Sequence, residues 1–282
     1  MSYGISINDL EFSDPKYFYS HQLNSSHFTA FTTRRYFADV SIPIGKLKQC
    51  LIDDFLNTKI FVRKKTRFSK KASCVYSGTE AVESAVIGND CCYIDNIDNQ
   101  YYIVCSNPDD YEFLVYKKID SLLKTRNKQP YGLEVYNQNG AITFNSTFDP
   151  CILLRIVNCN EICNSNIIVN TPSAGYPRAG MEIPNLLEIN QNNVNIGYSY
   201  CELGITASVF QKYQTKSPLY PKQVSGFYSM LVDGSGELRY VPCIGIIIGQ
   251  NDMIRGINDF GSMQNMNLNR NGLFIGVINR TI

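Results

Sequence analysis

The sequence predicts a mainly β protein in which an α+β region is followed by an antiparallel β-sandwich or barrel-like region. Short apolar segments recur along the second half, separated by Asn, Gly, Ser and Pro, which is typical of such folds. Helical spacing of apolar residues occurs only in the first half. Charge density also changes, because residues 1–127 hold 16 Lys or Arg and 15 Asp or Glu, whereas residues 128–282 hold 10 and 10. We therefore expect two domains, 1–127 and 128–282.

Composition limits the possible functions. The chain has 282 residues, a formal net charge of +1 and 18% charged residues, so it has no overall field to attract nucleic acid. No apolar stretch approaches the roughly 18 residues of a membrane span, and none is expected. The N-terminal segment lacks the basic region and apolar core of a signal peptide. Five of the 10 cysteines lie in apolar runs, namely Cys50, Cys74, Cys105, Cys151 and Cys243, and we expect the thiols to be reduced and buried.

The first region is expected to combine strands with three helices. At 46–57, Leu47, Leu51 and Phe55 are spaced four apart, as on one face of a helix. A second, two-turn helix is expected at 79–87. The third, at 108–125, has Asn107 as its N-cap and Pro108 at its first position. Strands are expected at 59–63 and, paired as a hairpin, at 91–95 and 100–105.

A basic stretch follows the strand at 59–63. One Phe interrupts its six positive charges, which are Arg63, Lys64, Lys65, Arg67, Lys70 and Lys71. Such a run is usually a solvated loop. The alternative is a contact with an acidic partner or a surface that bears phosphate groups.

The second region opens with a hairpin at 130–146. Leu133 and Val135 alternate with polar neighbours on its first arm, as Ile142 and Phe144 do on its second. Asn-Gly at 139–140 tolerates the positive φ that a tight or bulged turn needs. Further strands follow to 278, with a second hairpin turn at 232–237, Val-Asp-Gly-Ser-Gly-Glu.

A long neutral segment, 249–272, separates the last two expected strands. Its apolar side chains are costly to leave in water, so we expect the segment to contact a partner. The candidate interface residues are Met253, Ile254, Ile257, Phe260, Met263, Met266 and Leu268.

Residues 131–146, Tyr-Gly-Leu-Glu-Val-Tyr-Asn-Gln-Asn-Gly-Ala-Ile-Thr-Phe-Asn-Ser, resemble the start of an uncharacterised family of small tail proteins from tailed bacteriophages. Members of that family open with Tyr-Gly-Leu-x-Val-Tyr-Asn-x-x-Gly, followed by Phe-x-Ser. The closing Gly-Leu-Phe-Ile-Gly-Val-Ile-Asn, 272–279, is similar to the family's last strand. The resemblance covers about 130–282, whereas residues 1–129 precede the motif and suggest an appended domain. It implies a structural role in the virion and brings no catalytic residue.

Enzymatic chemistry finds little support in the residue patterns. His21 and His27 are the two histidines, and a solvated or capping role explains both. Cys159 and Cys163 have no matching metal-ligand pair, so no metal site and no cofactor are expected. Asp53-Asp54 and Asp109-Asp110 are poorly placed for paired acid and base work. A hydrolase of cell-surface glycan or peptidoglycan, with scattered acids, remains the alternative from this class.

The sequence thus leads us to expect a non-enzymatic structural protein of a phage tail, at the tail tip or baseplate. It would be made in the host cytoplasm and would assemble with itself, as a ring or trimer, and with other tail proteins. Adhesion to a receptor on the host surface is the close alternative. Nucleic acid is not expected as a partner.

Overall fold

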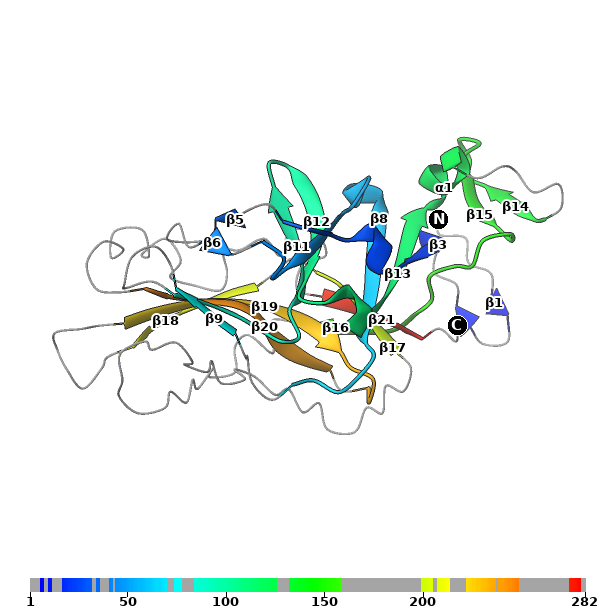
Figure 1. Ribbon diagram of the computed structural model, residues 1–282. Coiled ribbons are helices and arrows are strands. Elements are labelled where there is room, and N and C mark those ends of the chain that lie inside the picture. The colour runs from blue at the N-terminus through cyan, green and yellow to red at the C-terminus, as the bar shows by residue number, and fades with distance from the viewer. Residues whose placement is uncertain are drawn as a thin grey trace.

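The protein is mainly β in the computed structural model (Figure 1). The structure describes residues 6–7, 10–11, 17–31, 34–35, 41–42, 44–69, 74–77, 84–125, 132–158, 199–204, 207–213, 222–236, 238–248 and 274–279. Every strand pairing between these residues is antiparallel. The mainly β prediction is confirmed. No helix in the described part of the chain is long and apolar enough to cross a membrane.

The largest sheet has six strands. In spatial order they are β16 (Leu153–Asn158), β21 (Phe274–Asn279), β17 (Ser199–Glu202), β8 (Thr58–Lys64), β13 (Tyr111–Lys118) and β3 (Tyr17–Leu23). The segment before β16 also contacts the opposite edge, because Cys151 donates its N–H to the Tyr17 carbonyl at 2.8 Å. Residues 149–158 therefore reach both edges of this sheet.

Two further sheets complete the body. One has four strands in the order β11 (Cys92–Ile97), β12 (Gln100–Cys105), β7 (Lys48–Leu51) and β4 (Thr29–Ala30). The other has five strands in the order β18 (Ala207–Tyr213), β19 (Lys222–Val232), β20 (Leu238–Ile248), β10 (Ser84–Ile87) and β9 (Cys74–Ser77).

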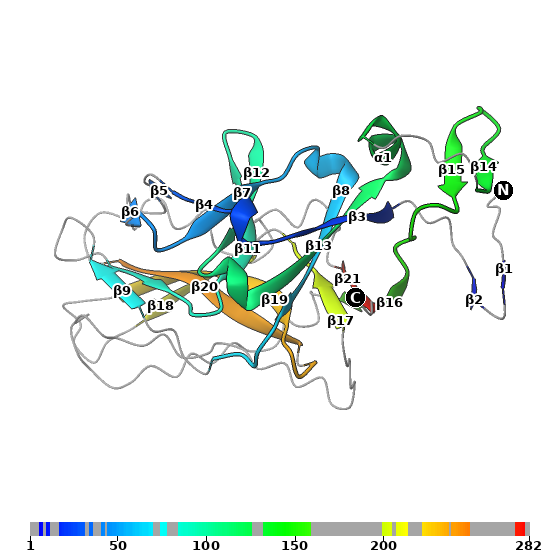
Figure 2. The same cartoon turned by 45° about the vertical axis from the view of Figure 1, so that its right-hand side comes forward.

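Small elements flank the three sheets. Three two-stranded pairs are β1 (Ser6–Ile7) with β2 (Leu10–Glu11), β5 (Arg34–Arg35) with β6 (Ser41–Ile42), and β14 (Glu134–Tyr136) with β15 (Ile142–Asn145). The short helical segments are η1 (Ser25–His27), η3 (Phe55–Asn57), η4 (Pro108–Asp110) and α1 (Ile119–Thr125). Both views place β14, β15 and α1 at one end of the molecule and β9 and β18 at the other (Figures 1 and 2).

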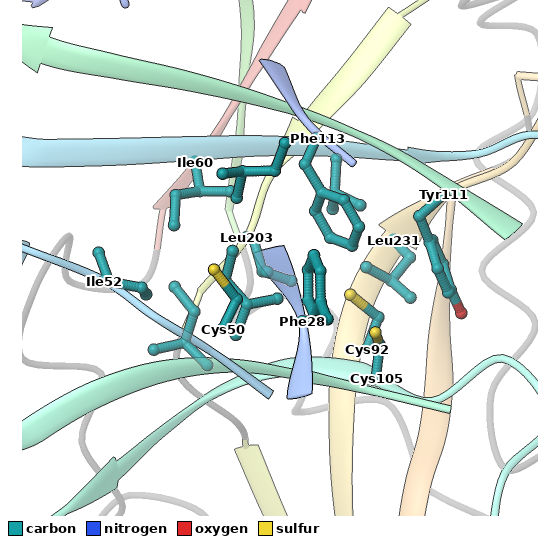
Figure 3. Close-up of a cluster of buried hydrophobic side chains, with 14 of the residues drawn as sticks. Phe28, Cys50, Ile52, Ile60, Cys92, Cys105, Tyr111, Phe113, Leu203 and Leu231 are labelled. Atoms are coloured by element: carbon teal, nitrogen blue, oxygen red, sulfur yellow. The ribbon is translucent and has the colours of Figure 1, made fainter. Parts of the chain in front are cut away.

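Side chains from the three sheets share one core (Figure 3). Phe113 of β13, Cys105 of β12 and Leu231 of β19 are each 0% exposed and belong to this cluster. Fully burying a large apolar side chain contributes about 1.5–3 kcal/mol, so a shared core couples the stability of the sheets.

The predicted boundary between 127 and 128 does not separate the sheets. Cys201 of β17 pairs with Val62 of β8, and Ile244 of β20 pairs with Ile87 of β10. Strands from both sides of the boundary thus lie in the same two sheets.

The predicted helix at 108–125 is wrong over most of its length. Asn107 caps a short 3-10 turn, η4, by accepting the Asp109 N–H, and β13 follows at once. β13 lies between β3 and β8 and is buried on both faces, so its apolar residues run continuously from Phe113 to Tyr116. A continuous apolar run fits a central strand and a buried helix equally well. Only the end, α1, is helical.

The other two predicted helices are also wrong where the structure describes them. In 46–57, β7 pairs with β12 and places Cys50 opposite Ile103, and η3 follows. Pairing on both edges of β7 outweighs the weak helical spacing of its side chains. In 79–87, residues 84–87 form β10, which lies between β20 and β9, and residues 79–83 fall outside the described residues. The α+β character expected for 1–127 reduces to strands with short turns of helix.

The hairpin predictions are confirmed. β11 pairs with β12 across Asp98 and Asn99, which both have positive φ, at 50° and 63°. The turn at 232–237 joins β19 to β20, where Gly236 donates its N–H to the Asp233 carbonyl at 2.9 Å. Residues 159–198, where further strands of the second region are also expected, lie outside the described residues.

Candidate interaction surface

The segment that carries the family resemblance folds as the hairpin β14–β15. Val135 pairs with Phe144, and a bulge follows Val135. In the turn, the Asn137 side chain accepts the N–H of Ala141 at 2.9 Å, and Gly140 takes a φ of 75°. The bulged Asn-Gly turn predicted here is therefore confirmed, with glycine at the position that needs positive φ.

The inner arm of this hairpin rests on the body of the protein. The rings of Phe144 and Phe18 have centroids 6.2 Å apart, and Ile142 and Phe144 pack on a buried cluster that includes Leu122 of α1. These contacts hold β15 against α1 (Figure 2). The hairpin is thus presented in a fixed orientation.

Several large apolar side chains between residues 133 and 153 are exposed. Leu133 is 58% exposed and Tyr136 is 53% exposed, and Ile152 and Leu153 follow at 48% and 43%. These four residues are grouped by their place in the chain, and we call them the motif surface; they include most of the seven large hydrophobic residues that are exposed among the described residues. In the described part of the chain β14 pairs with β15 alone, so its outer edge carries no strand. Exposed apolar side chains and a bare strand edge are features of contact surfaces.

The basic stretch makes mostly internal contacts. Arg63 forms an ion pair with Glu112, and its guanidinium lies 4.8 Å from the centre of the Tyr200 ring. Lys64 is buried, and its Nζ lies 3.1 Å from Asp90 Oδ1. Lys65 donates to the Asp109 carbonyl at 2.8 Å.

The remaining cations of the stretch are Arg67, Lys70 and Lys71. Arg67 is exposed, whereas Lys70 and Lys71 lie outside the described residues. The structure therefore does not gather these six cations into one open patch within the part it describes. The contact with a phosphate-bearing partner stays a prediction.

Two buried carboxylates hold the backbone of this stretch, and sequence reasoning missed both. Asp90 accepts the Ser69 N–H at 2.6 Å, and Asp233, which is 0% exposed, accepts the Phe68 N–H at 3.0 Å. The next residue, Gly234, packs against the backbone of the basic stretch, and an added Cβ there would lie 2.2 Å from the Lys65 carbonyl oxygen. For Asp233, the sequence signal was the Asp-Gly turn at 233–234. That turn predicts a hairpin, but it does not show that the Asp233 side chain binds the backbone at Phe68.

The second candidate surface is the long neutral segment between the last two expected strands. The segment 249–272, with Met253, Met263 and its other apolar residues, lies outside the described residues. Its assignment as an interface stays a prediction.

The titratable groups considered for catalysis make structural contacts. The Ser121 hydroxyl donates to Asp54 at 2.7 Å, and this bond holds the pKa of that carboxyl below its ordinary value. His27 accepts the Asn24 N–H at 3.2 Å and closes a capping box, which confirms its predicted capping role. No group of three or more His, Cys, Asp or Glu in the described part of the chain could hold a metal ion.

No protein-family model, no curated protein and no solved structure matches the chain.

Proposed function

We propose that this chain is a structural component of a bacteriophage tail, placed at the tip or baseplate of the virion. Copies of it would contact one another in a ring or trimer and would contact other tail proteins. The observation that supports the proposal is a coincidence of position: the 17-residue stretch from 130 to 146 that resembles a tail-protein opening also carries Leu133 and Tyr136, two of the four exposed apolar side chains of the motif surface.

The way the hairpin is held supports a contact role in energetic terms. An exposed apolar side chain gains about 1.5–3 kcal/mol when a partner buries it fully. Ordering a loop on binding would offset part of that gain. Because Phe144 already fixes the hairpin against the body, little ordering remains when Leu133 and Tyr136 meet a partner.

The antiparallel sheets fit the same role. We propose that they form a β-sandwich or barrel-like body, closed by residues 149–158 at the edges of the six-stranded sheet. A body with a shared core is suited to carry load between neighbouring subunits, since strands from both halves of the chain pair within it.

A paired substitution tests the proposal. Leu133→Ser with Tyr136→Ser should leave the folded chain intact but reduce its incorporation into phage particles at least tenfold. The control is Leu56→Ser, which changes a side chain that is 75% exposed and lies outside the motif surface. Circular dichroism reports folding, and mass spectrometry of purified particles reports incorporation. Equal incorporation of the paired variant and the control would contradict the proposed contact.

A further inference from the structure

Cys92 and Cys105 face each other directly across the hairpin β11–β12 (Figure 3). The register shows which kind of pair they form. Ser106 donates its N–H to the Cys91 carbonyl at 2.9 Å, so Cys91 and Ser106 occupy a hydrogen-bonded position. The next position along an antiparallel ladder is non-hydrogen-bonded, and there the Cα atoms are about 4.5 Å apart and the side chains lie closest. Cys92 and Cys105 occupy that close position.

A disulfide needs two Cα atoms about 4.4–6.8 Å apart with side chains on the same face. Both thiols point into the shared core from neighbouring strands (Figure 3). We propose that Cys92 and Cys105 are a modification site, a dithiol that closes into a cross-strand disulfide when the chain meets a peroxide oxidant.

The position of the pair in the sheet gives the oxidant a route. β11 is an edge strand of the four-stranded sheet, Cys92 is its first residue, and Cys105 is the last residue of β12. The pair therefore lies at the open end of the hairpin, and the oxidant would reach it when this end of the hairpin opens locally. Both thiols are 0% exposed in the closed sheet, and burial raises their pKa values, so the nucleophilic thiolate forms only during such opening.

The chemistry balances with hydrogen peroxide as the oxidant. The thiolate of one cysteine attacks a peroxide oxygen, a sulfur–oxygen bond forms, and the oxygen–oxygen bond breaks with loss of hydroxide. The second sulfur then attacks the first, the sulfur–sulfur bond forms, and the second hydroxide leaves. With the two thiol protons, both hydroxides become water, so two thiols are oxidised and one peroxide is reduced.

The setting of this reaction rests on the proposed function. A chain made in a reducing host cytoplasm keeps its thiols, and Cys92 and Cys105 are both free thiols in the structure. A virion released from the cell leaves that reducing pool. The disulfide would then tie the two strands of the hairpin that lines the shared core.

The nearest competitors are in the same region. Cys243 lies beside Cys91, and their interaction contributes to the raised pKa of Cys91. Cys50 belongs to the same cluster as the proposed pair but faces Ile103 across its strand pair, so it has no opposed thiol. Cys50 is therefore the matched control.

Non-reducing peptide mapping of the purified full-length chain, before and after exposure to hydrogen peroxide, tests the pair. Because Cys91 and Cys92 are adjacent, the mapping is repeated on Cys91→Ala, which leaves a single candidate at that end. The expected result is one linkage, Cys92 to Cys105, in wild type, in Cys91→Ala and in Cys50→Ala, and its loss in Cys105→Ala.

A linkage between Cys91 and Cys243, or oxidation of the thiols to sulfinic acid with no linkage, would overturn the proposal. If Cys105→Ala does not fold, the maps of wild type and Cys91→Ala still decide. A second arm separates this proposal from the tail role, by mapping the chain in purified phage particles. Linkage in the purified chain combined with absence of the chain from particles would refute the tail role and keep the dithiol site.

Discussion

Removing one partner of the buried ion pair between Lys64 and Asp90 should destabilise the protein far more than removing a neighbouring exposed charge. The two side chains are only 7% and 5% exposed. Asp90→Ala would leave the Lys64 ammonium buried with Thr66 Oγ1, at 2.8 Å, as its polar contact. Lys64→Met would leave the Asp90 carboxylate with the Ser69 N–H and hydroxyl.

The size of the effect depends on burial. Breaking a buried pair from one side costs about 3–5 kcal/mol, because the remaining charge is left without compensation. Asp90→Ala also removes two hydrogen bonds from Ser69, each worth about 1 kcal/mol, so it should lie at the upper end of that range. The double substitution removes both charges and should cost about 1–3 kcal/mol less than the sum of the single ones.

Urea unfolding measures these differences. The chain has 19 tyrosines and no tryptophan, so far-UV circular dichroism and tyrosine fluorescence are the probes. Lys65→Met is the control, because Lys65 is the exposed neighbour, and it should change the free energy of unfolding by about 0.5 kcal/mol or less. An Asp90→Ala cost no larger than that of Lys65→Met, or two single effects that simply add, would refute the role of the buried pair.

Three other outcomes are open to direct measurement. Gly234→Ala should lower the free energy of unfolding by about 1–3 kcal/mol, because its Cβ would lie 2.2 Å from the Lys65 carbonyl oxygen, and a loss below about 0.5 kcal/mol in urea unfolding would contradict this. A fragment of residues 130–282 lacks β8 and β10, the partners of β17 and β20, so it should show no cooperative urea transition, and a sharp transition would count against the shared sheets. Burial, and then the nearby charge of Asp53, raises the pKa of Cys50 from 9.0 to about 11. The contribution of this thiol to stability should therefore be fully present below about pH 9 and be lost as pH rises through 11. The free energy of unfolding should fall less between pH 8 and pH 11 in Cys50→Ala than in wild type.

Local signals predicted the hairpins well because a hairpin is set by residues close in sequence. The positive-φ turn at Asp98 and Asn99 and the Asn-Gly turn ending at Gly140 both depend on a few neighbouring residues. The same local logic failed for 108–125. Asn107 and Pro108 are true start signals, but they begin a 3-10 turn, and the pairing of β13 with β3 and β8 makes the next eight residues a strand.

The supports of the basic stretch could not be predicted for a different reason. Asp90 and Ser69 are 21 residues apart, and Asp233 and Phe68 are 165 residues apart. No periodicity or spacing links residues at such separations, since only the sheet register brings them together. The exposure of Leu133 was likewise not evident, because alternation shows that a strand has two faces and not which face is buried.

The proposed place of the chain in a phage tail is tested most directly by locating it on particles. An antibody raised against the purified chain and carried on gold would be applied to intact tailed particles from an infected culture. We predict label at the end of the tail, in repeated copies, and weaker label when a peptide of residues 131–146 competes for the antibody. Particles without label, together with the chain recovered only from the particle-free lysate, would contradict the tail role.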